Sequence, residues 1–312
     1  MKKLFQSVGL CIALVLTAPS MAFELKHNTG TIKSETTPKR IVSYDLLVLD
    51  NFNALGIEVV GVPKSIYKDD LAKFNDLPQI GTLFEPDYDV LKDLKPDLIF
   101  VGSRSQAATP QLEELAPTAN LTNQRISFLK DFRENTLALA AAFDKTKEAE
   151  EGLARIGRNI EELQKINAGK TAAFLFVHNG NIMTHVEGDR FGFTFEMTGL
   201  KPVLPGKTTK ELANPRPEPN SPAAKAATKK REQQINDIVK ADPDWLFVFD
   251  KGPISGGEKT AEDVISKHPG LSQTTAFKTA KVIYVDPPRW YLITGGLNNL
   301  KLITDDLLAK MK

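Results

Sequence analysis

Cationic and aromatic side chains stand just after three short apolar runs of this sequence. In an open sheet of mainly parallel strands, ligands bind beyond the carboxyl ends of the strands. Arginine is a permanently charged planar fork that suits both oxyanions and aromatic faces. The pattern predicts a binding site for an anionic, aromatic ligand, built by the residues that follow the runs LIFV, WLFVF and VIYV: Arg104, Lys251, Arg289, Trp290 and Tyr291.

Arg190 adds a fourth cation at the start of a predicted helix over 191–198. The N-terminus of a helix itself favours anions. Taken singly, each of these cations is also typical of a solvated surface, and Trp290 and Tyr291 are also typical of core packing. Only the set as a whole favours a ligand site, so both interpretations stay open for each single residue.

Signature motifs of common enzyme classes do not occur in the sequence. It has no G-x-S-x-G, no G-x-x-x-x-G-K-[ST] and no H-E-x-x-H. Among the four histidines, only His178 and His185 lie close together, seven residues apart in a predicted strand–turn–strand. A zinc pair there is one interpretation, but ordinary edge histidines are more typical of this spacing. We expect a protein that is not an enzyme and has no cofactor of its own.

Apolar runs that fit buried parallel strands alternate with helical patterns along the chain, which is typical of an α/β architecture. Two halves repeat one arrangement, since DLKPD at 93–97 precedes LIFV and KADPD at 240–244 precedes WLFVF. Between them, apolar residues of 132–167 recur every three or four positions, as in a helix. We predict an α/β fold of two similar lobes with mainly parallel sheets, joined by one long rigid helix, with the ligand cleft between the lobes.

The start of the chain has the layout of a secretory signal peptide. A basic beginning is followed by an apolar run at 8–18 and small residues before a cleavage site after Ala22. The run is shorter than the roughly 20 residues of a spanning helix. The only cysteine, Cys11, follows Leu10, where a lipid-attachment site has a small residue. We therefore expect an exported, soluble product that contains no thiol.

Two stretches lack an apolar pattern. Residues 23–39 are polar and predict a short arm, and residues 213–230 are rich in Pro, Ala and Lys and predict a long surface loop. The expected division of the chain is signal peptide 1–22, N-terminal lobe 23–145, inter-lobe helix 146–168 and C-terminal lobe 169–312.

Charge and composition exclude several classes. The chain of 312 residues has 40 Lys and Arg against 39 Asp and Glu, so it lacks the basic surplus of a nucleic-acid binder. Its 41% hydrophobic residues are enough for a sizeable core, and they exclude intrinsic disorder. We expect a monomer that binds no nucleic acid.

The motifs together carry a family resemblance over almost the whole mature chain. The chain resembles the periplasmic substrate-binding proteins of ABC importers for ferric siderophores, in the cluster with the ferrichrome and cobalamin binders. The segments that carry it are RIVS at 40–43, DNFNALG at 50–56, VGVP at 60–63, DYDVLKDLKPDLI at 87–99 and DPDWLFV at 242–248.

Within the cluster, the subgroup that binds catecholate siderophores is the most similar. This resemblance implies that Arg104 and Arg190 match two of its three siderophore-binding arginines, while Lys251 stands in place of the third and keeps the charge without the fork. Tyr291 matches a tyrosine that binds iron directly in some members. Arg231 occupies the place of that tyrosine's histidine partner.

The resemblance also implies partners. Family members dock on an inner-membrane ABC permease, with its ATPase, through one acidic residue on each lobe. Asp89 matches the first position, and Asp237 lies next to the second, which is Asn236 here. The expected function is capture of an Fe(III)-siderophore, of catecholate type, in the periplasm. Hydroxamate, carboxylate or mixed-chelate siderophores and haem remain alternatives on the same fold, and an exported siderophore esterase is a remote one.

Overall fold

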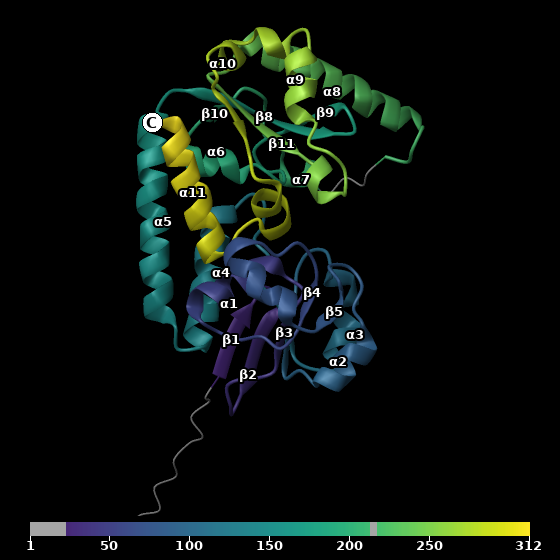
Figure 1. Ribbon diagram of the computed structural model, residues 1–312, viewed down its shortest axis with the longest axis vertical. Helices are drawn as coiled ribbons and strands as arrows, with labels where there is room; N and C mark the ends of the chain where they lie inside the picture. The colour runs from purple at the N-terminus through teal and green to yellow at the C-terminus, as the bar shows by residue number, and fades with distance from the viewer. Residues whose placement is uncertain (1–22, 213–216) are drawn as a thin grey trace, which may run out of the picture.

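The computed structural model describes residues 23–212 and 217–312. The predicted signal peptide at 1–22, with Cys11, lies outside these residues. The described chain forms two α/β lobes stacked one above the other, and long helices run along one side of both (Figure 1). This confirms the predicted α/β class and its mainly parallel sheets.

The first lobe is built on short parallel strands. β3 (Ile41–Ser43), β6 (Leu98–Val101) and β7 (Thr118–Asn120) form one sheet in the order β3-β6-β7. A bridge from Val42 to Gly61 continues it toward the parallel pair β4 (Val62–Lys64) and β5 (Gln79–Thr82). The helices and helical turns of this lobe are α1 (Leu46–Leu55), η1 (Asp69–Asp76), α2 (Tyr88–Leu94), η2 (Gln106–Ala108) and α3 (Thr109–Glu113).

The prediction of a polar arm at 23–39 was wrong. Residues Phe23–His27 (β1) and Gly30–Ser34 (β2) pair as an antiparallel hairpin. Phe23 and Leu25 are fully buried and alternate with polar residues, as is typical of a half-buried strand. This alternation covers only two apolar positions, which is too short to mark a strand in the sequence.

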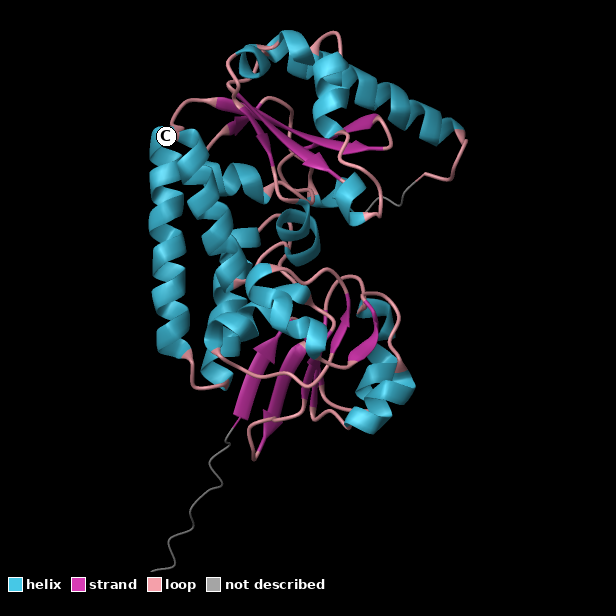
Figure 2. Cartoon of the chain, viewed as in Figure 1, coloured by secondary structure: helices cyan, strands magenta, loops and turns pink. Residues whose placement is uncertain are grey.

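Long helices link the lobes (Figure 2). The helical pattern over 132–167 is divided into α4 (Phe128–Ala142) and α5 (Thr146–Ile166) by a turn in which Asp144 has a φ of 54°. α5 lies within the range 146–168 that was expected for the inter-lobe helix. α5 has 21 residues and so spans about 30 Å. The last helix, α11 (Leu297–Met311), packs along α5, so two helices stiffen the connection.

The second lobe repeats the strand–helix scheme around a larger sheet. Its strand order is β10-β8-β11-β12, all parallel, and β9 pairs with β8 in an antiparallel hairpin. The strands are β8 (Thr171–His178), β9 (Asn181–His185), β10 (Lys201–Pro202), β11 (Trp245–Asp250) and β12 (Val282–Tyr284). The helices and helical turns are α6 (Phe193–Thr198), α7 (Thr209–Leu212), α8 (Pro222–Ala241), η3 (Gly252–Ile254), α9 (Ala261–Lys267), η4 (Leu271–Gln273), α10 (Thr275–Lys278) and η5 (Pro288–Ile293).

The prediction of a loop over 213–230 was wrong for its second half. α8 begins at Pro222, because proline is tolerated at the first position of a helix, and the Ser221 hydroxyl caps it by accepting from the Ala224 N–H. The Ala- and Lys-rich composition is itself helix-favouring, which outweighs the three prolines upstream. Residues 213–216 lie outside the described chain.

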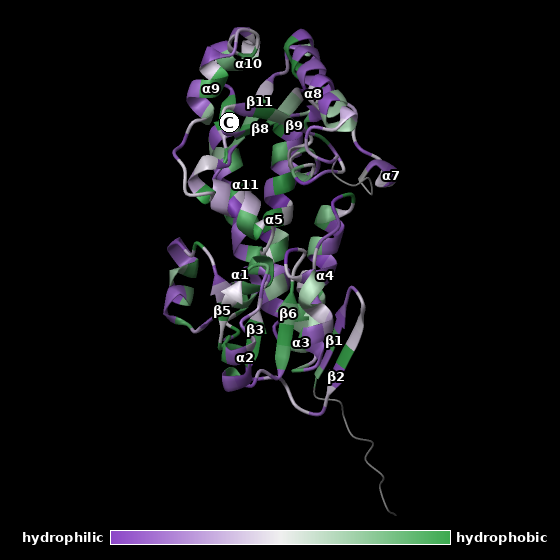
Figure 3. Cartoon of the chain, turned by 90° about the vertical axis from the view of Figure 1, so that its right-hand side faces the viewer, coloured by the Kyte–Doolittle hydropathy of each residue, from purple (hydrophilic) through white to green (hydrophobic). Residues whose placement is uncertain are grey.

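Apolar residues concentrate in the strands and on the inner faces of the helices (Figure 3). Strands β6, β8 and β11 are buried along almost their whole length, as expected for parallel strands with helices on both faces. The sheets are therefore rigid supports for the loops at their carboxyl ends.

Candidate ligand-binding cleft

A cavity of about 390 Å³ lies between the two lobes. The first lobe contributes residues from the ends of β3, β6 and β7, and the second contributes two turns that precede α6 and α11. The lining is Tyr44, Asp45, Leu47, Phe84, Gly102, Ser103, Arg104, Thr122, Asn123, Arg125, Phe128, Asp189, Arg190, Phe193, Tyr291, Leu292, Ile293 and Thr294.

Arg104 reaches this cavity from a tight turn after β6. The Ser105 hydroxyl, fully buried, accepts from the Gly102 N–H at 3.0 Å, and the Ser105 N–H donates to the Gly102 carbonyl. These bonds fix the turn, so Arg104 is carried by a rigid turn at the end of β6 rather than by a mobile loop.

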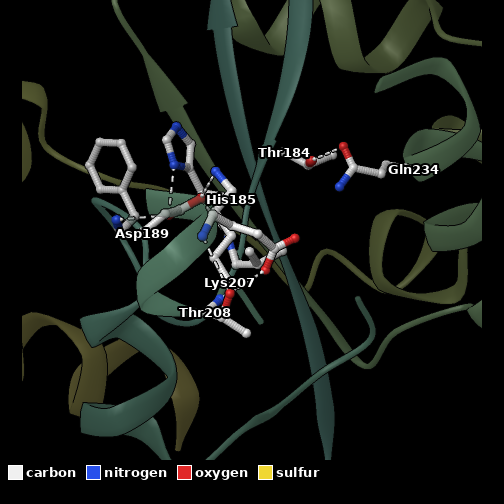
Figure 4. A network of polar contacts seen from close by, with 9 residues as sticks. Thr184, His185, Asp189, Lys207, Thr208 and Gln234 are labelled. Atoms are coloured by element: carbon white, nitrogen blue, oxygen red, sulfur yellow. Dashed lines mark hydrogen bonds and ion pairs between the residues drawn. The ribbon is translucent and has the colours of Figure 1, made fainter. Parts of the chain in front are cut away.

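Arg190 is presented by a second turn, between β9 and α6, that is organised around Asp189. This carboxylate is 3% exposed, and it accepts from His185 Nδ1 at 2.8 Å and from Lys207 Nζ at 3.2 Å (Figure 4). It also accepts from two backbone N–H groups of the turn. At Gly188, φ is 80° and a Cβ would lie 2.5 Å from the Lys207 carbonyl, so only glycine fits.

Burial alone raises the pKa of Asp189, but the hydrogen bond and charge of His185 and the charge of Lys207 outweigh it, and its pKa falls below the usual range. The turn therefore depends on an ionised Asp189. Replacing Asp189 by asparagine should cost about 2–4 kcal/mol in the free energy of unfolding, since it removes a buried carboxylate that accepts from His185, from the half-exposed Lys207 and from two backbone N–H groups. Urea unfolding at neutral pH measures this effect.

Asp263 offers a matched control for that substitution. It forms an exposed pair with Lys267 on α9, and its side chain is 64% exposed. Asp263→Asn should change the free energy of unfolding by less than about 0.5 kcal/mol. Equal effects of the two substitutions would contradict a structural role for the Asp189 network.

Tyr291 brings the two arginines together. It lies in η5, whose Thr294 N–H donates to the Arg289 carbonyl five residues back, as in a π-helical turn. The Tyr291 carbonyl accepts from Arg104 Nη2 at 2.6 Å and from Arg190 Nη2 at 3.1 Å. The Arg190 guanidinium lies 3.7 Å from the centre of the Tyr291 ring, and that of Arg104 lies 5.6 Å from it.

Both guanidiniums are partly removed from water. Desolvation lowers the pKa of Arg104. It also lowers the pKa of Arg190 to about 10, and the positive charges of Arg104 and Arg125 lower the pKa of Arg190 further. At neutral pH both side chains still carry their charge. Like charges held close in a partly dry cleft create an anion site, because an anionic ligand removes their mutual repulsion.

The third arginine at the cavity is Arg125, which the sequence did not single out. It lies five residues after β7, and this strand (TAN) has no apolar run that marks it in the sequence. Lys251, the residue expected in this role, follows β11 but is not among the residues that line the cavity. Its backbone N–H pairs with the Val177 carbonyl, at the end of the sheet.

Three other predicted residues also lie away from the cavity lining. Trp290 is 3% exposed and packs on Phe193 in the core, so the core interpretation of this residue is the one that the structure favours. Arg289 forms an ion pair with Asp69 at 2.7 Å. Arg231 lies on α8, where it donates to the Thr228 hydroxyl.

The cavity lining has several polar groups whose bonding capacity is unused within the described chain. The Thr122 hydroxyl and the Asn123 side-chain nitrogen are buried, and neither has a hydrogen-bond partner there. Phe84 also lines the cavity and is 61% exposed, one of two large apolar side chains with such exposure in the described chain. A ligand that combines oxygen acceptors with an aromatic surface would use all three groups.

The histidine pair does not form a metal site in this fold. His178 and His185 lie on the two strands of the β8–β9 hairpin, but they do not face each other. His178 pairs with Asn181, whereas His185 pairs with Phe174, so the two histidines are four positions apart along the hairpin. Across the described residues, no group of three or more His, Cys, Asp or Glu side chains is placed to hold a metal ion.

Comparison with known proteins decides the family. A family model described as "Periplasmic binding protein" matches residues 41–288. The chain belongs to this family. The petrobactin-binding protein YclQ of Bacillus subtilis is 28% identical over 285 residues, with 88% of this chain and 84% of that protein covered. The ferric-anguibactin-binding protein FatB of Vibrio anguillarum is 26% identical, with 91% and 86% covered.

Solved structures agree. The iron uptake ABC transporter substrate-binding protein PiuA from Streptococcus pneumoniae matches with a TM-score of 0.79 and 25% identity, covering 95% of this chain and 100% of PiuA. The names of these relatives describe binding proteins, for petrobactin, for ferric anguibactin and for the substrate of an iron uptake ABC transporter. The predicted family membership and two-lobed binding-protein fold are thus confirmed.

The residues expected to dock on a permease are both at the surface. Asp89 lies in α2 with a side chain that is 94% exposed and paired with Lys92, and Asp237 lies in α8 and accepts from Gln233. Of the helices in the described ranges, none has the length and apolar character that crossing a membrane requires.

Proposed function

We propose that this protein binds a ferric siderophore of catecholate type in the periplasm and delivers it to an inner-membrane ABC permease for iron uptake. The observation that carries the proposal is the convergence of Arg104 and Arg190, from different lobes, on Tyr291 in one cavity. The names of the relatives, which include petrobactin, anguibactin and iron uptake, support an iron chelate as ligand.

Charge favours the catecholate class. A ferric tris-catecholate is a trianion whose charge is spread over aromatic oxygens, and Arg104, Arg125 and Arg190 supply three cations at the cavity. Each charge-assisted hydrogen bond contributes about 1.5–3 kcal/mol. The exposed ring of Phe84 offers a surface on which a catechol ring can pack.

Tyr291 is the residue that we propose as a direct iron ligand for siderophores that leave coordination positions open. It lines the cavity, and its ring lies against the Arg190 guanidinium, so its side chain is held at the site by the same cation that would bind an anionic chelate. A tyrosinate–iron charge-transfer band, absent in Tyr291→Phe, is the expected spectroscopic signature.

Delivery requires docking on the permease. Asp89 and Asp237 lie on different lobes and are exposed, so basic residues on a permease can reach both. The exposed pair of Asp89 with Lys92 costs little to exchange for a partner's cation, because exposed salt bridges contribute less than about 1 kcal/mol.

Fluorescence titration tests the proposed ligand. Trp290 is next to Tyr291 in the chain, so a ferric chelate in the cavity should quench its emission by energy transfer. We expect saturable 1:1 quenching by a ferric tris-catecholate with a Kd below about 1 μM, and binding at least about 10-fold weaker for a near-neutral ferric hydroxamate. Equal or tighter binding of a hydroxamate, carboxylate or haem ligand selects that alternative, and binding of no ferric chelate refutes the proposal.

A further inference from the structure

Asp45 is an acid that lines the basic cavity. It lies between β3 and α1, and it faces the same cavity as Arg104, Arg125 and Arg190. An ionised carboxylate among these arginines reduces the attraction of the site for any simple anion. Its presence therefore needs an account beyond the binding of a trianion.

Part of the account is structural. Asp45 is the N-cap of α1, and its Oδ1 accepts from the Leu47 N–H at 3.0 Å. The Ser43 hydroxyl braces the same turn, since it accepts from the Asp45 N–H and donates to the Asp45 carbonyl. A Cβ on Gly102 would lie 2.9 Å from Asp45 Oδ2, so the glycine leaves room for the carboxylate. Asp45 is thus held in one orientation.

Capping uses only one carboxylate oxygen. Within the described chain, no donor bonds to Oδ2, and Arg104 acts on it through charge without a direct ion pair. The Arg104 guanidinium donates instead to the carbonyls of Tyr291 and Leu292. A serine would cap α1 equally well, so the second oxygen is a surplus acceptor in a cavity that is otherwise rich in donors.

We infer that Asp45 selects ferric chelates whose linker carries a protonated amine, which Asp45 Oδ2 binds while the arginines bind the anionic iron centre. This inference rests on the proposed function and narrows its ligand class. The site then recognises a zwitterionic complex, which has negative charge at the iron centre and positive charge on the linker between the chelating groups.

Two matched ligands test the inference. Both are ferric complexes of two 2,3-dihydroxybenzoyl groups on one linker; one linker contains a secondary amine, and the other has a methylene in its place. We expect wild-type protein to bind the amine ligand about 10-fold more tightly, as for a charge-assisted hydrogen bond in a partly desolvated site. In Asp45→Asn, which keeps the volume and the helix cap, this ratio should fall to about 1–2-fold.

Acidity provides a second readout. Desolvation raises the pKa of Asp45 to about 6 despite the Leu47 N–H and Arg104. The other titratable or charged groups that line the cavity are Tyr44, Arg104, Arg125, Asp189, Arg190 and Tyr291. Protonation of the catechols affects both ligands alike, so it cancels in the ratio of their Kd values. In wild type, the preference for the amine ligand should rise between pH 5 and 7.5 as Asp45 ionises. In Asp45→Asn, this preference should not change with pH.

The outcomes separate the two levels of the proposal. If both ligands bind and the ratio is the same in wild type and in Asp45→Asn, Asp45 is only a helix cap and the inference fails while the proposed function stands. If neither ligand nor any other ferric chelate binds, the proposed function fails and the inference with it. Asp45→Ser, which also caps a helix, provides the same comparison should the asparagine variant not fold.

Discussion

Replacing Arg190 by alanine should weaken binding of a ferric tris-catecholate by at least about 100-fold. The loss combines one or two charge-assisted hydrogen bonds, at about 1.5–3 kcal/mol each, with the guanidinium surface that lies on Tyr291. Arg104→Ala should act similarly. Because both side chains donate to the Tyr291 carbonyl, the double variant should lose less than the sum of the two single losses.

Two other cations serve as controls in the same fluorescence titration. Lys251 was expected at the site from the sequence but does not line the cavity, so Lys251→Ala should change the Kd by less than about 3-fold. Arg125 lines the cavity but is exposed, so Arg125→Ala should raise the Kd by an amount between the effects of Lys251→Ala and Arg190→Ala. A larger effect at Lys251 than at Arg190 would overturn the placement of the site.

The fold was largely predictable because its strands are buried on both faces. The runs at β6, β8 and β11 leave a continuous apolar signal. The hairpin of β1 and β2 was missed because only two of its positions are fully buried. The start of α8 was missed because proline marks both loops and helix N-termini, and composition alone does not distinguish them.

The site was predictable only where a side chain follows a strong strand or opens a helix. Arg104 and Arg190 meet this condition, and the structure brings both to the cavity with Tyr291. Arg125 also lies there, but no apolar run or helix start marks it in the sequence. Asp45 opens α1, but a search for cations at an anion site passes over an acid. Trp290 is buried in the core instead of lining the cavity. Which side chains of an irregular turn point inward depends on tertiary packing, and the spacing of residues in the sequence does not determine it.

A polar cluster joins the lobes beside the cavity. From α1, the carboxylate of Asp50 accepts from the Asn299 N–H at 3.0 Å, and the Asn51 side chain accepts from the Leu297 N–H at 2.8 Å. These bonds cap the N-terminus of α11, the helix that packs along α5. Asp50 is 1% exposed, so an acid of the first lobe is buried at the start of a helix of the second.

Asp50 should contribute a loss of stability as pH rises from about 4 to about 7. Desolvation, with the nearby charge of Asp70, raises the pKa of Asp50 to about 7, although the Asn299 N–H and Arg289 oppose the shift. Between the ordinary aspartate pKa and this value, the folded state holds a proton that the unfolded state has lost, so unfolding becomes easier as pH rises. The full shift corresponds to at most about 4 kcal/mol.

Asp50→Asn isolates this contribution, because asparagine keeps the acceptor oxygen and does not titrate. The difference in the free energy of unfolding between variant and wild type should shift by about 3–4 kcal/mol in favour of the variant between pH 4.5 and 8. Every other group, including Asp45, cancels in that difference. Urea unfolding at four or five pH values measures it, with the exposed Asp263→Asn as the matched control. A difference for Asp50→Asn that is independent of pH would mean that water reaches this carboxylate and that the link between the lobes does not depend on its protonation.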